Sequence, residues 1–165
     1  MLFRSRLLRN FPELRVRAIV YLAAACTIDD YRASVLPYLA RHQETRFYNL
    51  SLHPSAEEGE WQKKYLDLPP RGSLLVWIDN FLSDPSSPLD RTLGSWDNVL
   101  QVVHVIPQAL RARTSLRMFD VGVSRPGPVE PETHGGFSDP RTRFWCPQVW
   151  TGNGEPTAPC ANTRF

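Results

Sequence analysis

The sequence predicts an α/β protein with a mostly parallel sheet of about four strands and helices on both faces. Short apolar runs alternate with longer segments in which apolar residues recur at helical spacing, which gives the order βαβαβαβ. The clearest run, Leu74 to Ile78, is unbroken and opened by Gly72, as in strands buried on both faces of a parallel sheet. Strands joined through helices in this order form a parallel sheet with right-handed crossovers.

Length and composition indicate one globular domain. A chain of 165 residues, with 42% hydrophobic and 22% charged residues, can bury a sizeable core. Nineteen Lys and Arg residues against 17 Asp and Glu, well mixed along the chain, argue against a nucleic-acid partner. No run reaches the roughly 18 apolar residues that a membrane span requires. The three cysteines lack metal-type spacing, and their odd number favours reduced thiols and a cytoplasmic location over a disulfide framework.

The amino-terminal end is basic and amphipathic. Residues 1–15 form a separate segment, in which we expect a short helix ending near Pro12. The arginines before the apolar run from Ala18 to Cys26 also resemble a lipoprotein signal, but Pro12 and several charged residues interrupt the approach to that run. We therefore predict a buried first strand from Val16 to Ala25, with the lipoprotein signal as the alternative.

The next elements follow from capping and alternation. Thr27 is suited to cap a helix that runs through Leu39, and Pro37 should kink or shorten that helix. A second strand is expected from Arg46 to His53. Its two faces alternate, with Phe47, Asn49 and Ser51 on one side and Tyr48, Leu50 and Leu52 on the other.

The remaining elements continue the same order. A polar helix is expected over 55–68, the third strand over 74–78, an interrupted helix over 96–109 and the fourth strand over 114–121. Beyond Gly122 the chain is rich in Gly and Pro, apart from an aromatic patch at Phe144, Trp145 and Trp150. Residues 151–165 are expected to form a disordered tail, so that the α/β domain spans 16–150.

The candidate chemistry lies after the predicted third and fourth strands. Asp79 follows the third strand directly, where parallel sheets bind ligands, and Asp84 and Asp90 in the next loop are alternate acids. His134 lies in a Gly-rich loop after the fourth strand, where backbone freedom lets an imidazole project into a site. The structural alternatives are a cap or turn role for Asp79 and a local ion pair between Asp90 and Arg91.

No nucleophile is evident, and no metal or cofactor is expected. The chain has no P-loop, GxGxxG, HExxH or CxxC motif. Ser95 lacks the second glycine of a GxSxG elbow, and Cys26, at the start of a helix, is either a thiolate nucleophile or a small core residue. The other histidines, His42, His53 and His104, are expected to be structural, because none has acids or cysteines at ligand spacing.

Five stretches of the sequence carry a family resemblance. They are Val20-Tyr-Leu-Ala-Ala-Ala-Cys26, Phe47-Tyr-Asn-Leu-Ser-Leu-His-Pro54, Arg71-Gly-Ser-Leu-Leu-Val-Trp-Ile-Asp79, Leu89-Asp-Arg-Thr-Leu-Gly94 and His134-Gly-Gly-Phe137 followed by Phe144-Trp145. Together they resemble bacterial hydrolase-like proteins of the α/β-hydrolase superfamily. The order of strand, acid-bearing loop, helix, strand and His loop over residues 16–150 is similar to the carboxyl-terminal half of that fold.

The resemblance implies hydrolysis of a small-molecule ester, with a lipid-type acyl ester as one candidate. It makes His134 the general base and Asp79, Asp90 or Asp84 the acid that holds its tautomer. The serine elbow of the family precedes a strand like the first one here, and only about fifteen residues precede that strand. The resemblance therefore implies a carboxyl-terminal portion that is inactive alone, with a sheet edge that self-association or a partner chain covers.

The alternative is a non-catalytic module. In that interpretation the α/β domain binds a protein partner through the aromatic patch of Phe144, Trp145 and Trp150. Because no nucleophile is identifiable, the sequence leaves open whether the chain is an enzyme.

Overall fold

The computed structural model describes residues 3–60, 72–119, 130–143, 146 and 149–150. Its centre is a three-stranded parallel sheet in the order β1 (Ala18–Leu22), β2 (Arg46–Ser51) and β3 (Thr114–Met118). The middle strand, β2, pairs Leu50 with Leu22 of β1 and with Arg117 of β3. The predicted α/β class and parallel sheet are confirmed, with three strands in the described residues where about four were expected.

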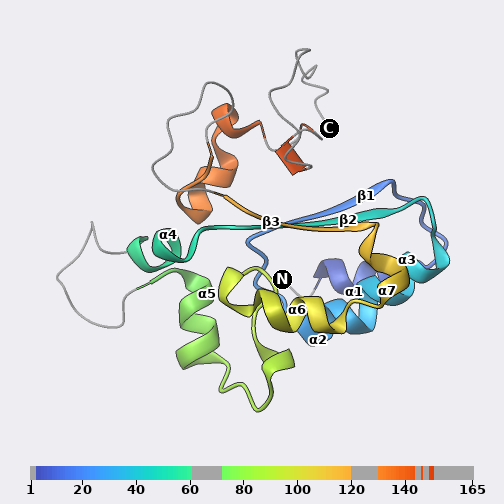
Figure 1. Cartoon of the computed structure of the whole chain (residues 1–165), viewed down its shortest axis with the longest axis horizontal. Helices are drawn as coiled ribbons and strands as arrows, with labels where there is room; N and C mark the ends of the chain where they lie inside the picture. Colours follow the sequence, from blue (N-terminus) through green and yellow to red (C-terminus); the bar gives the residue numbers. More distant parts are fainter. Residues whose placement is uncertain (1–2, 61–71, 120–129, 144–145, 147–148, 151–165) are drawn as a thin grey trace.

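The two faces of the sheet are covered differently (Figure 1). On one face lie α1 (Phe3–Asn10), α2 (Ile28–Asp30), α3 (Leu36–Arg41), α6 (Val99–Val105) and α7 (Gln108–Arg111). On the other face lie two 3-10 turns, η5 (His134–Ser138) and η6 (Pro140–Thr142). In the described part of the chain, the second face therefore carries short 3-10 turns where α-helices were expected.

Side chains of β2 reach two apolar clusters, one on each face of the sheet. Phe47 packs against Tyr21 of β1 and Tyr31, with ring centroids 5.3 and 4.7 Å apart. Leu50 belongs to the second cluster, together with Phe119 and Phe137. The alternation predicted for this strand is therefore confirmed.

The first crossover begins with the cap that the sequence predicts. Thr27 Oγ1 accepts a hydrogen bond from the backbone N–H of Asp30 at 3.0 Å. The helix then continues through a π-helical turn, η1 (Tyr31–Val35), into α3. Pro37 has no N–H to donate, and the wider turn before it accommodates this loss. The effect of Pro37 is thus a change of winding within a helix that continues to Arg41.

The chain from Leu74 to Leu82 is a helix, so the predicted third strand is wrong. It comprises α5 (Leu74–Trp77) and a second π-helical turn, η2 (Ile78–Leu82). Ser73 caps it by accepting hydrogen bonds from backbone N–H groups of the first turn, and Gly72 reaches the cap with a φ of +116°. A continuous apolar run of this length fits a buried strand or a helix, and the cap decides between them.

The second crossover, from β2 to β3, is long. It starts with α4 (Pro54–Gly59), which His53 caps by accepting a hydrogen bond from the Ser55 N–H at 3.1 Å. The predicted helix over 55–68 is thus present to Gly59, and residues 61–68 lie outside the described residues. Two 3-10 turns, η3 (Pro88–Asp90) and η4 (Trp96–Asn98), precede α6. The interruption predicted at Pro107, between α6 and α7, is confirmed.

The cysteines differ from the expectation of reduced thiols. Cys26 is a buried free thiol, whereas Cys146 takes part in a disulfide bond. An odd number of cysteines prevents the pairing of all of them, not the formation of one pair, which is why the prediction was wrong. Among the described residues, no helix has the length and apolar character to cross a membrane. Phe144, Trp145 and the predicted tail lie outside the described residues.

Candidate acid–base site

The carboxyl ends of β2 and β3 bring acids and a histidine together. α4 follows β2 and carries Glu57, with Glu60 directly after the helix. His134 is the first residue of η5, which comes after β3 in the chain. η5 lies on the face of the sheet opposite to the α-helices α1, α2, α3, α6 and α7. Parallel sheets bind ligands at this edge, because loops from neighbouring strands converge there.

His134 is fixed by two contacts with the Glu60 carboxylate. Its backbone N–H donates to Oε1 at 2.8 Å, and its Nδ1 lies 2.7 Å from Oε2. Since a carboxylate accepts hydrogen bonds, Nδ1 carries a proton in this contact, and in the neutral imidazole Nε2 holds the lone pair. Both side chains are largely covered, with 26% and 15% of their surface exposed. Glu60 therefore sets both the orientation and the tautomer of His134.

Glu57 is the buried acid of the site. Its side chain is 2% exposed, and the Ser73 hydroxyl donates a hydrogen bond to Oε2. Burial raises the pKa of the Glu57 carboxyl, and the negative charges of Glu60 and Asp97 add to this, while the Ser73 hydrogen bond and the charge of His134 oppose it. Glu57 therefore keeps its proton at pH values at which an exposed glutamate has lost it.

Two polar atoms of this cluster are buried with an unused hydrogen-bonding position. Oε1 of Glu57 and Nε2 of His134 have no hydrogen-bond partner in the described part of the chain. Buried polar atoms are nearly always paired, so each of these atoms calls for water or for a polar group of a ligand. One is a carboxyl that retains a proton and the other is the lone pair of an oriented imidazole. Glu57 can therefore act as an acid and His134 as a base.

The cluster does not have the arrangement of a metal site. Within the described residues, no group of three or more His, Cys, Asp and Glu side chains could hold a metal ion.

Asp79 does not contact His134. It lies on η2 rather than at a strand end, and its side chain is 6% exposed. It accepts hydrogen bonds from the Thr92 N–H at 2.7 Å, from the Thr92 Oγ1 at 2.9 Å and from the Asn98 Nδ2 at 2.7 Å. Both carboxylate oxygens are used to hold the loop before α6. These contacts agree with the alternative of a structural role for Asp79. The acid that contacts His134 is Glu60.

The alternate acids also lie apart from His134. Asp84 is exposed just after η2, with a φ of +40°. Asp90 accepts hydrogen bonds from the Ser86 hydroxyl and the Ser87 N–H, both at 2.8 Å, and these hydrogen bonds lower the pKa of its carboxyl. The expected local ordering of this loop thus comes from serines and not from an ion pair with Arg91.

The candidate nucleophiles are buried. Burial raises the pKa of the Cys26 thiol to about 12, which is the opposite of the shift that an activated thiolate needs. Ser95 is 6% exposed, and Ser73 is fully buried with its hydroxyl directed at Glu57. None of the three presents a free nucleophile to solvent.

The remaining histidines have structural surroundings. His53 caps α4, and His42 stacks on Tyr38 with ring centroids 4.2 Å apart. His104 is exposed on α6. His42 Nδ1 also lies 3.8 Å from a carboxylate oxygen of Glu44, but the contact between His134 Nδ1 and Glu60 is closer, at 2.7 Å.

Glu57 and Glu60 are the site residues that the sequence prediction missed. The sequence places both in the polar helix expected over 55–68 and marks neither as a site residue. A usable signal was present, because both follow a strand within ten residues, at the sheet edge where the His-bearing loop was also expected. Comparisons with protein-family models, curated proteins and solved structures find no match to the chain.

Proposed function

We propose that the chain hydrolyses a small ester at the site formed by Glu57, Glu60 and His134. The observation that carries this proposal is the doubly anchored His134, whose Nδ1 faces a carboxylate and whose Nε2 is left without a partner. An imidazole held in this way is the usual general base of hydrolytic sites. The resemblance to α/β-hydrolases favours an ester as the substrate class, although that resemblance by itself implies a chain that is inactive alone.

In the proposed reaction the attacking group is water, since Cys26, Ser95 and Ser73 are all buried. His134 Nε2 takes a proton from the water as its oxygen bonds to the acyl carbon, and Glu60 stabilises the imidazolium that forms. The bond from the acyl carbon to the alcohol oxygen then breaks, and Glu57 donates its proton to that oxygen. His134 passes its extra proton to Glu57 through solvent, which restores both groups for the next turnover.

The test is hydrolysis of a chromogenic ester, p-nitrophenyl butyrate, by the full chain and its variants. His134→Ala should lower the rate constant by about 100-fold or more, which is the usual contribution of a general base. Glu60→Gln should also lower the rate, because the amide no longer fixes the charged imidazole.

His104→Ala is the matched control, since it removes an exposed imidazole on α6. It should leave the rate unchanged. Equal rates for the wild-type chain and His134→Ala, with both proteins folded, would contradict the proposed hydrolysis.

The alternative of a partner site on the aromatic patch receives less support. Trp150, the member of that patch within the described residues, lies against Tyr48 of β2 with ring centroids 5.6 Å apart. It belongs to the partly buried side chains around the second apolar cluster. The most exposed large apolar side chains of the described chain lie elsewhere, on helical segments.

A further inference from the structure

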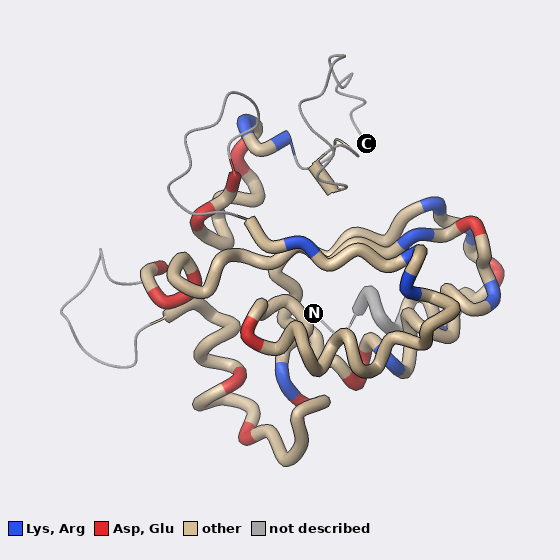
Figure 2. The backbone as a smooth tube through the Cα atoms, in the orientation of Figure 1, with Lys and Arg blue, Asp and Glu red and all other residues tan. Residues whose placement is uncertain are grey.

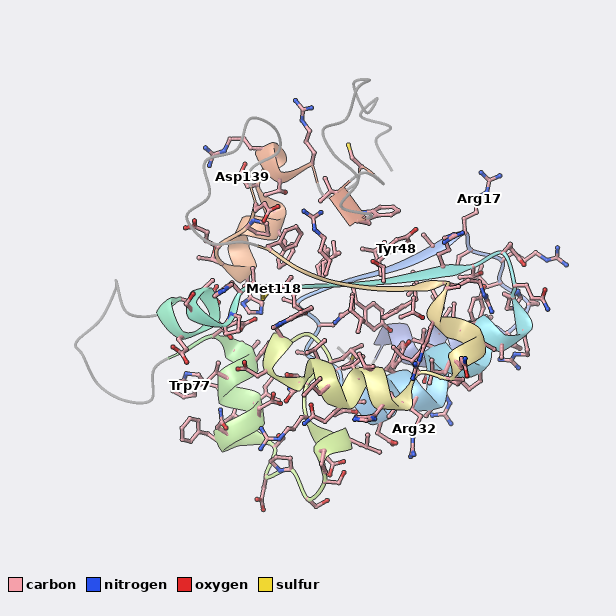
Figure 3. The ribbon with its side chains drawn as sticks, in the orientation of Figure 1. Arg17, Arg32, Tyr48, Trp77, Met118 and Asp139 are labelled. Atoms are coloured by element: carbon pink, nitrogen blue, oxygen red, sulfur yellow. The ribbon has the colours of Figure 1, made fainter. Side chains whose placement is uncertain are left out.

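The helix formed by α5 and η2 has one apolar face that the described chain does not cover. Leu74, Phe81 and Leu82 are 55%, 59% and 64% exposed, and Trp77 packs edge-on against Phe81 with ring centroids 6.1 Å apart. The opposite face of the same helix is buried through Leu75 and Asp79. Figure 3 shows Trp77 on the outer side of the helix, away from the sheet. We call Leu74, Trp77, Phe81 and Leu82 the outer face.

The outer face lies in an acidic part of the molecule. The chain from Pro54 to Val99 has eight acidic and four basic residues, a net charge of −4. Figure 2 shows acidic positions along α4, at η2 and in the loop before α6, while many basic positions lie at the other end of the sheet. A partner for this face should therefore combine apolar side chains with positive charge.

The amino-terminal segment of the same chain has that combination. Its first 17 residues contain five arginines and one glutamate. Leu8 of α1 is buried against the core, while Leu7, Phe11 and Leu14 are 39%, 50% and 39% exposed. Leu7 and Phe11 are four positions apart, so they lie on the same side of the helix and its end. In this way α1 packs its own domain through Leu8 and leaves Leu7 and Phe11 exposed within a basic segment of the sequence.

We propose that the outer face of one chain binds the exposed side of α1, through Leu7 and Phe11, of a second copy. Apolar contact between Phe81 and Phe11 lies at the centre of this interface. The negative potential around α5 and the arginines of the amino-terminal segment attract each other and fix the orientation. Because the two surfaces are different, the contact joins unlike patches of identical chains.

Light scattering after size exclusion tests association. At about 50 mM NaCl the wild-type chain should have the mass of at least two copies of its 18.9 kDa. Phe81→Asp and Phe11→Asp should each give the mass of one copy with an unchanged circular dichroism spectrum. Leu100→Asp is the control, because Leu100 is 68% exposed on α6 but outside both patches, and it should associate like the wild-type chain.

Mixing the two interface variants separates this contact from a contact between like patches. Phe11→Asp retains an intact outer face and Phe81→Asp retains an intact α1, so the mixture should form pairs although neither variant does so alone. Raising NaCl to about 500 mM should weaken the pairs, because it shortens the Debye length to a few ångströms. A wild-type chain that stays monomeric at all concentrations, or variants that do not complement each other, would overturn the proposal.

Discussion

At the scale of single residues, the environment of a carboxyl group decides what it does. Glu57, Glu60 and Asp79 are all acids near the same edge of the molecule, yet they meet different partners. Asp79 has donors on both oxygens, and Glu60 has the backbone and imidazole of His134. Glu57 has one hydroxyl donor and is buried, and burial favours its neutral form.

Glu57→Gln should make the protein more stable at neutral pH. Burial raises the pKa of Glu57 above its ordinary 4.5, so the stabilisation from its neutral carboxyl is complete below that pH and is lost as pH rises through the folded-state pKa. Gln stays neutral throughout. The melting temperatures of the variant and the wild type should therefore agree at pH 4 and separate in favour of the variant by pH 8.

Glu58→Gln provides the control for that comparison, because Glu58 is exposed on the same helix. Its melting temperature should follow the wild type at every pH. A Glu57→Gln variant that is less stable than the wild type at pH 8 would show that Glu57 is charged in the folded state.

Asp79→Ala should destabilise the fold strongly. It leaves the Thr92 N–H, the Thr92 hydroxyl and the Asn98 amide without their acceptor in a buried position. Each unsatisfied buried donor costs roughly 1–3 kcal/mol, so the free energy of unfolding in urea should fall by about 3 kcal/mol or more. Asp97→Ala, at an exposed position, should change it by no more than about 0.5 kcal/mol. Similar midpoints for the two variants would contradict the structural role of Asp79.

At the scale of elements, the loop before α6 is hydrogen-bonded to the loop that follows β1. The Leu93 N–H donates to the Cys26 carbonyl at 2.8 Å, and the Gly94 N–H donates to the Ala24 carbonyl at 2.9 Å. The loop after β1 is therefore paired with a segment almost seventy residues later. Within the Leu93-Gly-Ser-Trp96 stretch, the sequence analysis considers Ser95 as a nucleophile. In the structure the most constrained residue of this stretch is Gly94, because the backbone of Ala23 and Ala24 leaves no room for a side chain there.

Gly94→Ala should disrupt this loop pairing. A Cβ at this position would lie 2.1 Å from the Ala24 nitrogen and 2.4 Å from the Ala23 carbonyl carbon, so backbone must move. We expect a loss of about 3 kcal/mol in the free energy of unfolding, at the upper end for overpacking. Gly59→Ala, near the end of α4, meets nothing within 4 Å and should be neutral or stabilising by up to about 1 kcal/mol. Chemical denaturation of both variants checks the contrast.

The helix of α5 and η2 could not be predicted from the local sequence pattern. Its apolar residues were read as a strand because five of them are consecutive, from Leu74 to Ile78. The Ser73 cap was visible in the sequence, but the contact of its hydroxyl with Glu57 was not. That contact joins the start of the helix to α4.

At the scale of the whole molecule, the features that depend on a few neighbouring residues could be predicted from the sequence. Thr27 capped a helix, β2 alternated its faces, and Pro107 separated two helices, because caps, pleats and proline act within a few residues. The α/β class followed from the alternation of such elements. His134 was selected for its flexible surroundings and its place after the last strand.

Tertiary structure alone decided which acid meets His134. Glu60 is 74 positions away from it, and no local pattern ranks one acid above another across such a distance. The same holds for the burial of Asp79, which depends on a loop that folds back 13 and 19 positions later. Tertiary packing also decided that Cys26 is buried and that Leu74 and Phe81 are exposed. The sequence shows which side chains are hydrophobic or can form hydrogen bonds, but their partners depend on how the whole chain packs.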